Sequence, residues 1–145
     1  MEEFKLERFV EAQNGIYDTI LRELRAGRKE SHWMWFVFSQ LKELCKSRTA
    51  EYYGIESIEE ARAYLAHPVL GSRLEECLQI LLNLKTSNPV MIFGKDDAQK
   101  LHSSVTLFSY ADPDNELFKK IIDKFWGLEE QETKNILTRD RLSLI

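Results

Sequence analysis

The sequence has few of the residues that interrupt, crosslink or anchor a fold: its 145 residues include 6 glycines, 3 prolines and 2 cysteines. The cysteines, Cys45 and Cys77, fall on apolar helical faces, which predicts packed, reduced thiols rather than a disulfide. The glycines are isolated, so the chain lacks a glycine-rich loop that could hold the phosphates of a nucleotide cofactor. We therefore expect no bound cofactor.

Long apolar segments are also absent. The longest uncharged apolar run, residues 33–38, is far shorter than the ~20 residues that cross a bilayer. The first residues lack the basic start and apolar centre of a secretory signal. These features predict a cytoplasmic protein without a membrane partner.

Charge and histidine content exclude two further classes of site. The formal net charge of -4 argues against a protein that binds nucleic acid through its overall field. The three histidines, His32, His67 and His102, are far apart, and neither cysteine belongs to a Cys-x-x-Cys pair. The sequence therefore predicts no metal site.

Apolar side chains recur at spacings of three and four along most of the chain, and no segment alternates with period two for long enough to build a sheet. We predict a single all-α domain over residues 1–145, with roughly seven helices around a buried aromatic helix. The first helix covers residues 6–24 with a weak point at Asn14-Gly15, and Gly27 ends it. The aromatic helix follows from Ser31 to about Cys45; a strand has the same short-range pattern, but the length of the segment favours a helix.

The second half of the chain continues this pattern. A short helix begins at Ser57 and ends near Ala66-His67, because Pro68 disfavours helical backbone at the preceding residue. A helix with an apolar stripe at 70–82 follows, then a buried connector or marginal strand at 90–93. Asp96 or Asp97 caps the next helix, and a further amphipathic helix covers 117–125. A weaker helix at 131–137 leads into a loosely packed tail at about 138–145.

Several polar side chains lie within these apolar elements: Gln13, His32, Gln40, His67, Ser103, Ser104 and Thr106. Most buried polar groups cap helices or satisfy the backbone, and His67 before Pro68 fits that role. Alternatively, the set converges in one polar pocket with apolar walls.

Ordered blocks of the sequence resemble a bacterial family catalogued as domain of unknown function 1810. The similar blocks are 8–13, 27–38, 53–55, 60–74, 92–94, 97, 100–101 and 103–108. The resemblance implies a compact all-α fold and no particular activity, because the family is uncharacterised. Two departures stand out: Ser39 replaces the usual Pro, and Lys42–Cys45 replaces the usual Gly-Leu-Gly. Without that Pro and those glycines, we expect the helix after Trp35 to be longer and straighter.

We predict that the domain binds a small anionic or nucleotide-like ligand. The charge, the stacking surface and the hydrogen bonds have separate sources. The charge comes from Arg28, Lys29, Arg73 and Lys100, the stacking surface from Trp33 or Trp35, and the hydrogen bonds from Gln13, His32, His67 and Ser103. Gln40, Ser104 and Thr106 complete the candidate set.

Two other functions remain open, and the sequence does not decide whether the protein is an enzyme or which residues are catalytic. In a hydrolase acting on an ADP-ribose-type substrate, His32 serves as general acid or base with Asp97 as its partner; Phe9-x-x-Ala12-Gln13 is faintly similar to a helix of such hydrolases. In a protein-interaction module, Trp126 and the tail from Arg139 to Ile145 contact a protein partner that the sequence does not identify.

Overall fold

The computed structural model describes residues 4–143, which form 10 α-helices and one short 3-10 helix. These are α1 (Glu7–Asn14), α2 (Tyr17–Ala26), α3 (Met34–Val37), η1 (Lys42–Leu44), α4 (Arg48–Tyr52), α5 (Ile58–Ala66), α6 (Leu70–Asn83), α7 (Pro89–Phe93), α8 (Lys95–Ala111), α9 (Glu116–Phe125) and α10 (Gln131–Ser143). The all-α prediction is confirmed. In this part of the chain, extended pairing is limited to one isolated bridge between Leu41 and Ile55. None of its helices is long and apolar enough to cross a membrane.

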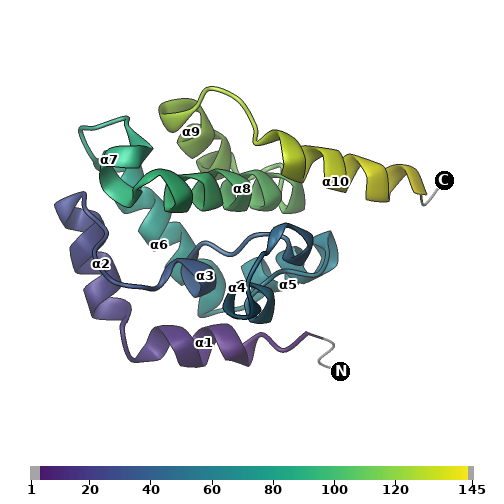
Figure 1. The fold of residues 1–145 in the computed structure, drawn as a ribbon, viewed down its shortest axis with the longest axis horizontal. Coiled ribbons are helices and arrows are strands. Elements are labelled where there is room, and N and C mark those ends of the chain that lie inside the picture. The colour runs from purple at the N-terminus through teal and green to yellow at the C-terminus, as the bar shows by residue number, and fades with distance from the viewer. Residues whose placement is uncertain (1–3, 144–145) are drawn as a thin grey trace.

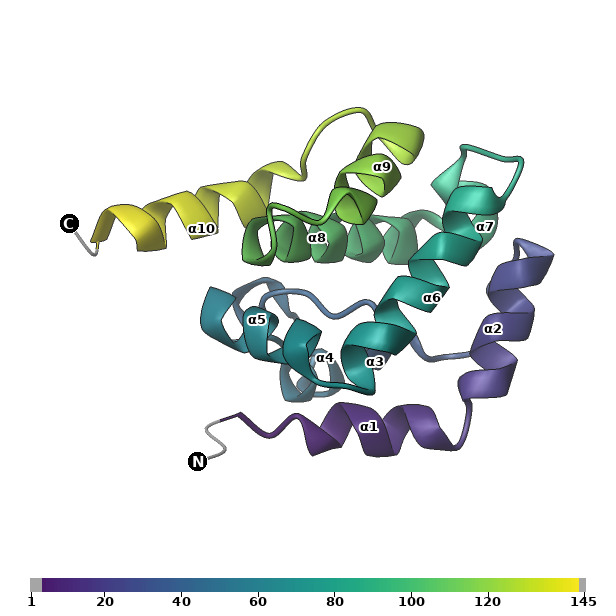
Figure 2. The same cartoon turned by 180° about the vertical axis from the view of Figure 1, so that it is seen from behind.

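Helix α8 runs through the middle of the molecule. Figure 1 shows α9 and α10 on one side of α8 and α1 at the opposite edge, and the view from behind in Figure 2 agrees. α8 packs against α5, α7, α9 and α10. Its apolar residues Leu101, Val105 and Phe108 are buried, and so are all positions from Leu101 to Ser109. The buried central helix is therefore α8.

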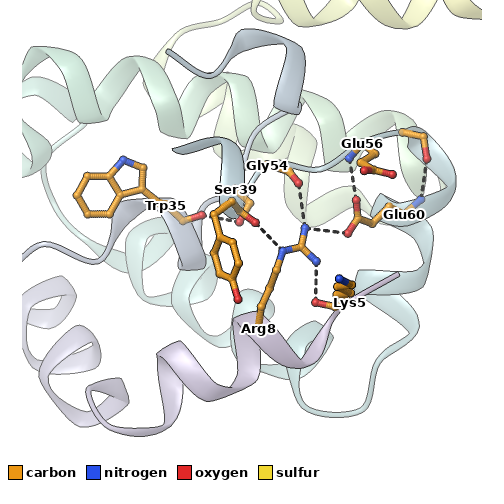
Figure 3. A network of polar contacts seen from close by, with 9 residues as sticks. Lys5, Arg8, Trp35, Ser39, Gly54, Glu56 and Glu60 are labelled. Atoms are coloured by element: carbon orange, nitrogen blue, oxygen red, sulfur yellow. Dashed lines mark hydrogen bonds and ion pairs between the residues drawn. The ribbon is translucent and has the colours of Figure 1, made fainter. Parts of the chain in front are cut away.

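The aromatic segment does not form the long helix predicted from Ser31 to Cys45. Its helical part, α3, is a single turn, and the chain leaves helical geometry at Phe38, with φ -113° and ψ 69°. Ser39 Oγ then donates a 2.7 Å hydrogen bond back to Trp35 O, which satisfies a carbonyl at the end of the turn (Figure 3). The expectation of a longer, straighter helix without the family Pro is wrong, because Ser39 closes the turn instead.

Extended pairing with a distant segment holds residues 40–42 out of a helix. Ile55 N donates to Gln40 O at 2.9 Å, and Lys42 N donates to Ile55 O at 2.8 Å. This approach requires glycine at position 54, because a Cβ there would lie 2.7 Å from the Cα of Lys42. The sequence around Gln40 cannot reveal a partner that lies 15 residues further on, which is why helical periodicity misled the prediction.

Further splits explain why there are more than the predicted seven helices. The first predicted helix divides into α1 and α2 at Gly15, the weak point expected there. Residues 89–93, predicted as a connector or strand, form α7, with Asn88 Oδ1 accepting from Val90 N. α8 begins at Lys95 after Gly94, so the cap predicted at Asp96 or Asp97 is wrong, and both residues lie in the first turn. α10 extends to Ser143, and residues 144–145 of the predicted tail lie outside the described residues.

Other helix ends fall where the sequence places them. Ser57 Oγ accepts from Glu60 N at the start of α5, and α5 ends at Ala66 ahead of His67. α9 ends just before Gly127, whose φ of 82° lies in the left-handed region that glycine adopts freely. Both cysteines are free thiols; Cys77 is buried, and burial raises its pKa to about 12.

Candidate functional site

Four of the predicted ligand-binding residues converge on one cleft beside α8. Trp35, Gln40, Lys100 and Ser103 line a space of about 450 Å³, which we call the α8 cleft. The other polar and charged groups on its wall are Lys46, Ser47, Asp96, Gln99, Glu130 and Glu132. A second hollow of about 340 Å³ beside α9 contains none of the predicted residues. The cleft joins the segment after α3 to α8 and to the start of α10.

Lys100 is held at the cleft by a shared carboxylate. Asp97 Oδ2 lies 2.7 Å from Lys29 Nζ, and Asp97 Oδ1 lies 3.4 Å from Lys100 Nζ. The ammonium of Lys100 also lies 5.7 Å from the centre of the Trp35 ring. Since one carboxylate serves two lysines, this triad keeps a net positive charge. Lys100 therefore retains charge with which to attract an anion.

Glu130 anchors the other end of the cleft. Ser103 Oγ donates to its Oε1 at 3.1 Å, and the backbone N and Oγ1 of Thr133 donate to the same oxygen. Thr106 Oγ1 accepts from the backbone N of Glu130 at 2.9 Å. Burial alone would raise the pKa of Glu130, but the hydrogen bonds from Thr133, Glu132 and Ser103 hold it below its ordinary value. The carboxylate is therefore charged, and it begins α10 as a cap.

Gln13 and Arg73 lie together in a different place, between α1, α3 and α6. Gln13 Nε2 donates to Phe36 O at 2.6 Å and to the Tyr64 hydroxyl at 3.3 Å. Gln13 Oε1 accepts from Arg73 Nη1 at 3.2 Å, and Arg73 Nη2 donates to Asn14 Oδ1. The amide of Gln13 thus has protein partners at both ends. This pair ties the α3 turn to its neighbours and lies outside the α8 cleft.

Trp33 belongs to a third polar cluster, centred on Glu23. This buried carboxylate accepts hydrogen bonds from Glu30 N, Ser31 N, Ser31 Oγ and Trp33 Nε1. Burial opposes the charge, but the hydrogen bonds from Ser31, Glu30 and Trp33 outweigh it and lower the pKa of Glu23 to about 2. The sequence analysis missed Glu23. Its signal was present: a glutamate on the buried stripe that includes Ile20 and Leu24.

Arg8 holds a further network that the sequence analysis did not assign (Figure 3). Its guanidinium donates to the carbonyls of Lys5, Tyr52 and Gly54 and pairs with Glu60 at 3.0 Å. The other oxygen of Glu60 accepts from Glu56 N. Because every arm of the guanidinium has a protein acceptor, Arg8 fixes α1 against the turn before α5 and is not available for a ligand.

The remaining candidates are dispersed. His67 Nδ1 accepts from Val69 N at 3.1 Å and from Leu70 N at 3.3 Å, so its ring caps α6. Arg28 and His32 are exposed. Ser104 is fully buried, and its hydroxyl has no hydrogen-bond partner in the described part of the chain. Among residues 4–143, no group of three or more His, Cys, Asp and Glu side chains could hold a metal ion.

Trp126, the candidate for a partner-binding groove, stacks on His102. The two rings are 4.2 Å apart and nearly parallel, and His102 Nε2 lies 2.7 Å from Leu128 O. Burial holds the pKa of His102 below its ordinary value. The neutral ring donates from Nε2 to the Leu128 carbonyl, since only a protonated nitrogen can donate there. Trp126 thus packs the end of α9 against α8.

The fold and the site define a compact helical protein with a mixed polar and aromatic cleft. The model of the family described as Protein of unknown function (DUF1810) matches residues 3–137, so the chain belongs to this family, as its sequence blocks indicate. The crystal structure of the conserved hypothetical protein Rv1873 from Mycobacterium tuberculosis is similar, with 46% identity and a TM-score of 0.92. The match covers 94% of this chain and 99% of that chain. No curated protein matches.

Proposed function

We propose that this protein binds a small ligand with a flat ring and one anionic group, such as a nucleoside monophosphate, in the α8 cleft. The observation that carries the proposal is the convergence of Trp35, Gln40 and Lys100 on one space of about 450 Å³, a size typical of small-molecule sites. These residues come from separate segments, and each supplies a different kind of contact.

Trp35 supplies the stacking surface. Its side chain is only partly buried and lines the cleft, so part of the indole is accessible to a ring. Stacking of a nucleobase on an aromatic side chain contributes about 1–3 kcal/mol. Among residues 4–143, the amide of Gln40 makes only a weak 3.9 Å contact with Cys45 Sγ, which leaves it able to bond the edge of the ring.

The charges on the cleft wall suit one anionic group better than several. Lys46 and Lys100 attract an anion, whereas Asp96, Glu130 and Glu132 oppose the accumulation of negative charge. A triphosphate brings several negative charges close to these carboxylates. We therefore expect a monophosphate to bind more tightly than the corresponding triphosphate.

We do not extend the proposal to hydrolysis. The hydrolase hypothesis requires His32 to work with Asp97, but His32 is exposed and Asp97 already pairs with Lys29 and Lys100. A general base must reach its proton through a hydrogen bond or one water molecule. Binding alone is what the geometry of the cleft supports.

The test is titration calorimetry with adenosine 5′-monophosphate, with tryptophan fluorescence as a second readout. Lys100→Ala removes a charge-assisted hydrogen bond and Trp35→Ala removes the stacking surface, so each is expected to weaken binding about 10-fold or more. Arg28→Ala is the matched control, because Arg28 was also predicted to attract the ligand but is exposed outside the cleft.

The control should bind as tightly as the wild type. Equal weakening by Lys100→Ala and Arg28→Ala would indicate a diffuse charge effect and contradict the proposed site. Circular dichroism and thermal unfolding of each variant show whether the fold is retained, which separates loss of a contact from loss of structure. If neither the monophosphate, the triphosphate nor adenosine binds, the proposed function is wrong.

A further inference from the structure

The two carboxylate oxygens of Glu130 have unequal numbers of hydrogen bonds. Oε1 accepts from Ser103 Oγ, Thr133 N and Thr133 Oγ1, at distances of 3.1, 2.9 and 2.5 Å. Within the described part of the chain, Oε2 accepts only from Glu132 N, at 2.8 Å. Because each carboxylate oxygen has about two acceptor positions, Oε1 is saturated and Oε2 can accept one more donor.

Glu130 lies in the wall of the cleft, which distinguishes it from a carboxylate in the packed interior. The residue is 5% exposed, and it lines the α8 cleft. Glu23 has a similar distribution of donors, three on one oxygen and one on the other, but it lines neither of the two hollows described above. A charged acceptor with spare capacity in the wall of a cleft can be satisfied by a ligand, and one in a packed interior cannot.

We propose that Glu130 Oε2 accepts a hydrogen bond from the ligand, and that Glu130 thereby selects ligands that carry a donor in addition to their anionic group. This inference rests on the proposed function, because it assigns a residue to the same site. In a nucleoside monophosphate, the donor is either the exocyclic amine of the base or a ribose hydroxyl. Both present an N–H or O–H to a carboxylate, which is the stronger class of hydrogen bond.

A hydrogen bond from the ligand to Glu130 would offset the repulsion between this carboxylate and the anionic group of the ligand. Lys100 and Ser103 are one helical turn apart on α8, and Ser103 holds the carboxylate of Glu130. The cleft is therefore polarised, with the cationic group of Lys100 beside an acceptor. An anion without a donor, such as sulfate, cannot give Glu130 a hydrogen bond, so we expect it to bind weakly.

The test compares ligands that differ in one donor. Adenosine 5′-monophosphate is titrated beside purine riboside 5′-monophosphate, which lacks the amine, and 2′,3′-dideoxyadenosine 5′-monophosphate, which lacks the ribose hydroxyls. One of the two analogues is expected to bind the wild type about 10-fold or more weakly, since a hydrogen bond to a charged group is lost. Which analogue loses affinity identifies the donor.

Glu130→Gln places either an amide N–H₂ or a neutral oxygen at Oε2, so the difference between the ligands should shrink to about 2-fold or less. Glu132→Gln is the matched control, because it makes the same charge change on an exposed residue of the same cleft, and it should keep the wild-type difference. Retention of the full difference in Glu130→Gln overturns the inference.

Two outcomes separate this inference from the proposed function. If all three nucleotides bind the wild type equally and Trp35→Ala weakens them all, the cleft is a binding site and the inference about Glu130 is wrong. If none of them binds, the proposed function fails and the inference with it. Should Glu130→Gln not fold, carboxylate ¹³C NMR of the wild type replaces it: the monophosphate should shift the Glu130 resonance more than the analogue that lacks the donor, and equal shifts overturn the inference.

Discussion

Glu23 shows how a single carboxylate fixes an entire loop. Its four donors come from the segment between α2 and α3, so the residue holds this segment against α2 without any regular structure. It is 3% exposed, and a buried charge of this kind is stable only when hydrogen bonds replace its hydration. The aromatic segment therefore depends on Glu23 for the direction in which it leaves α2.

Part of the acid sensitivity of the fold should trace to this residue. The pKa of Glu23 is about 2 in the folded state, against an ordinary value of 4.5. A depressed carboxyl pKa gives stability that is complete above pH 4.5 and is lost as the pH falls from 4.5 towards 2. The shift corresponds to at most about 3 kcal/mol. Glu23→Gln should remove this part of the pH dependence and lower stability at neutral pH.

Urea denaturation between pH 2.5 and 7 measures the effect. Glu11→Gln is a suitable control, because Glu11 is an exposed carboxylate on α1. The control should follow the wild-type profile. An unchanged pH profile in Glu23→Gln would show that the carboxylate does not contribute as its hydrogen bonds indicate.

At the scale of the element, helix ends were predictable where the signal is local. Ser57 at the start of α5, His67 at its end and Gly127 after α9 act within a few residues of the backbone groups they satisfy. The end of α3 was not predictable, because it depends on pairing of Gln40 and Lys42 with Ile55. Periodicity describes which face of an element is apolar, and it does not contain the position of a partner segment.

The C-terminus of α6 also depends on a residue that is distant in the sequence. α6 has no basic residue in its last turn, and the cation is supplied by α9: Lys124 Nζ donates to the carbonyls of Leu81, Leu82 and Leu84. Burial lowers the pKa of Lys124. Leu81 O also accepts from the backbone N of Leu84 at 3.2 Å, and Lys124 adds donors for the carbonyls at this helix end, so the lysine acts as a helix cap.

Lys124→Met keeps the aliphatic stem and removes the donors, so it should destabilise the protein by about 1–3 kcal/mol. Lys120→Met, on the exposed face of the same helix, should change stability by less than about 0.5 kcal/mol. Thermal and chemical denaturation give both values. If the two variants unfold alike, the cap is not a determinant of stability.

At the scale of the whole molecule, the position of α8 determines which residues meet. Trp35, Gln40, Lys100 and Ser103 could be nominated from the sequence as polar or aromatic residues on apolar elements, and α8 brings them to one cleft. Gln13, Arg73 and His67 had the same sequence signal but form structural contacts elsewhere. Residue type predicted which polar groups need a partner. Only the tertiary arrangement showed which of them bond to other protein groups and which line a cleft.

The central place of α8 also predicts a gradient of local stability. Most of its backbone is covered by four other helices, whereas in α10 Thr133 and Leu137 are buried and Thr138, Arg139 and Asp140 are exposed. Amide hydrogen exchange should therefore be slowest in α8 and fastest in α10 beyond Leu137, because exposed helical turns open without global unfolding. Mass spectrometry of exchanged peptides measures this order, and equal protection of the two helices would contradict it.

The late position of α8 in the chain has a consequence for synthesis. Residues 95–111 leave the ribosome after α1 to α7, yet α5 and α7 bury their apolar faces against them. Until Ala111 has emerged, the nascent chain can form individual helices and the contacts of Arg8 with residues 52–60, but it cannot close its core. A stalled chain that ends before α8 should therefore expose apolar surface and bind chaperones, and emergence of α8 from the ribosome should end that binding as the core closes.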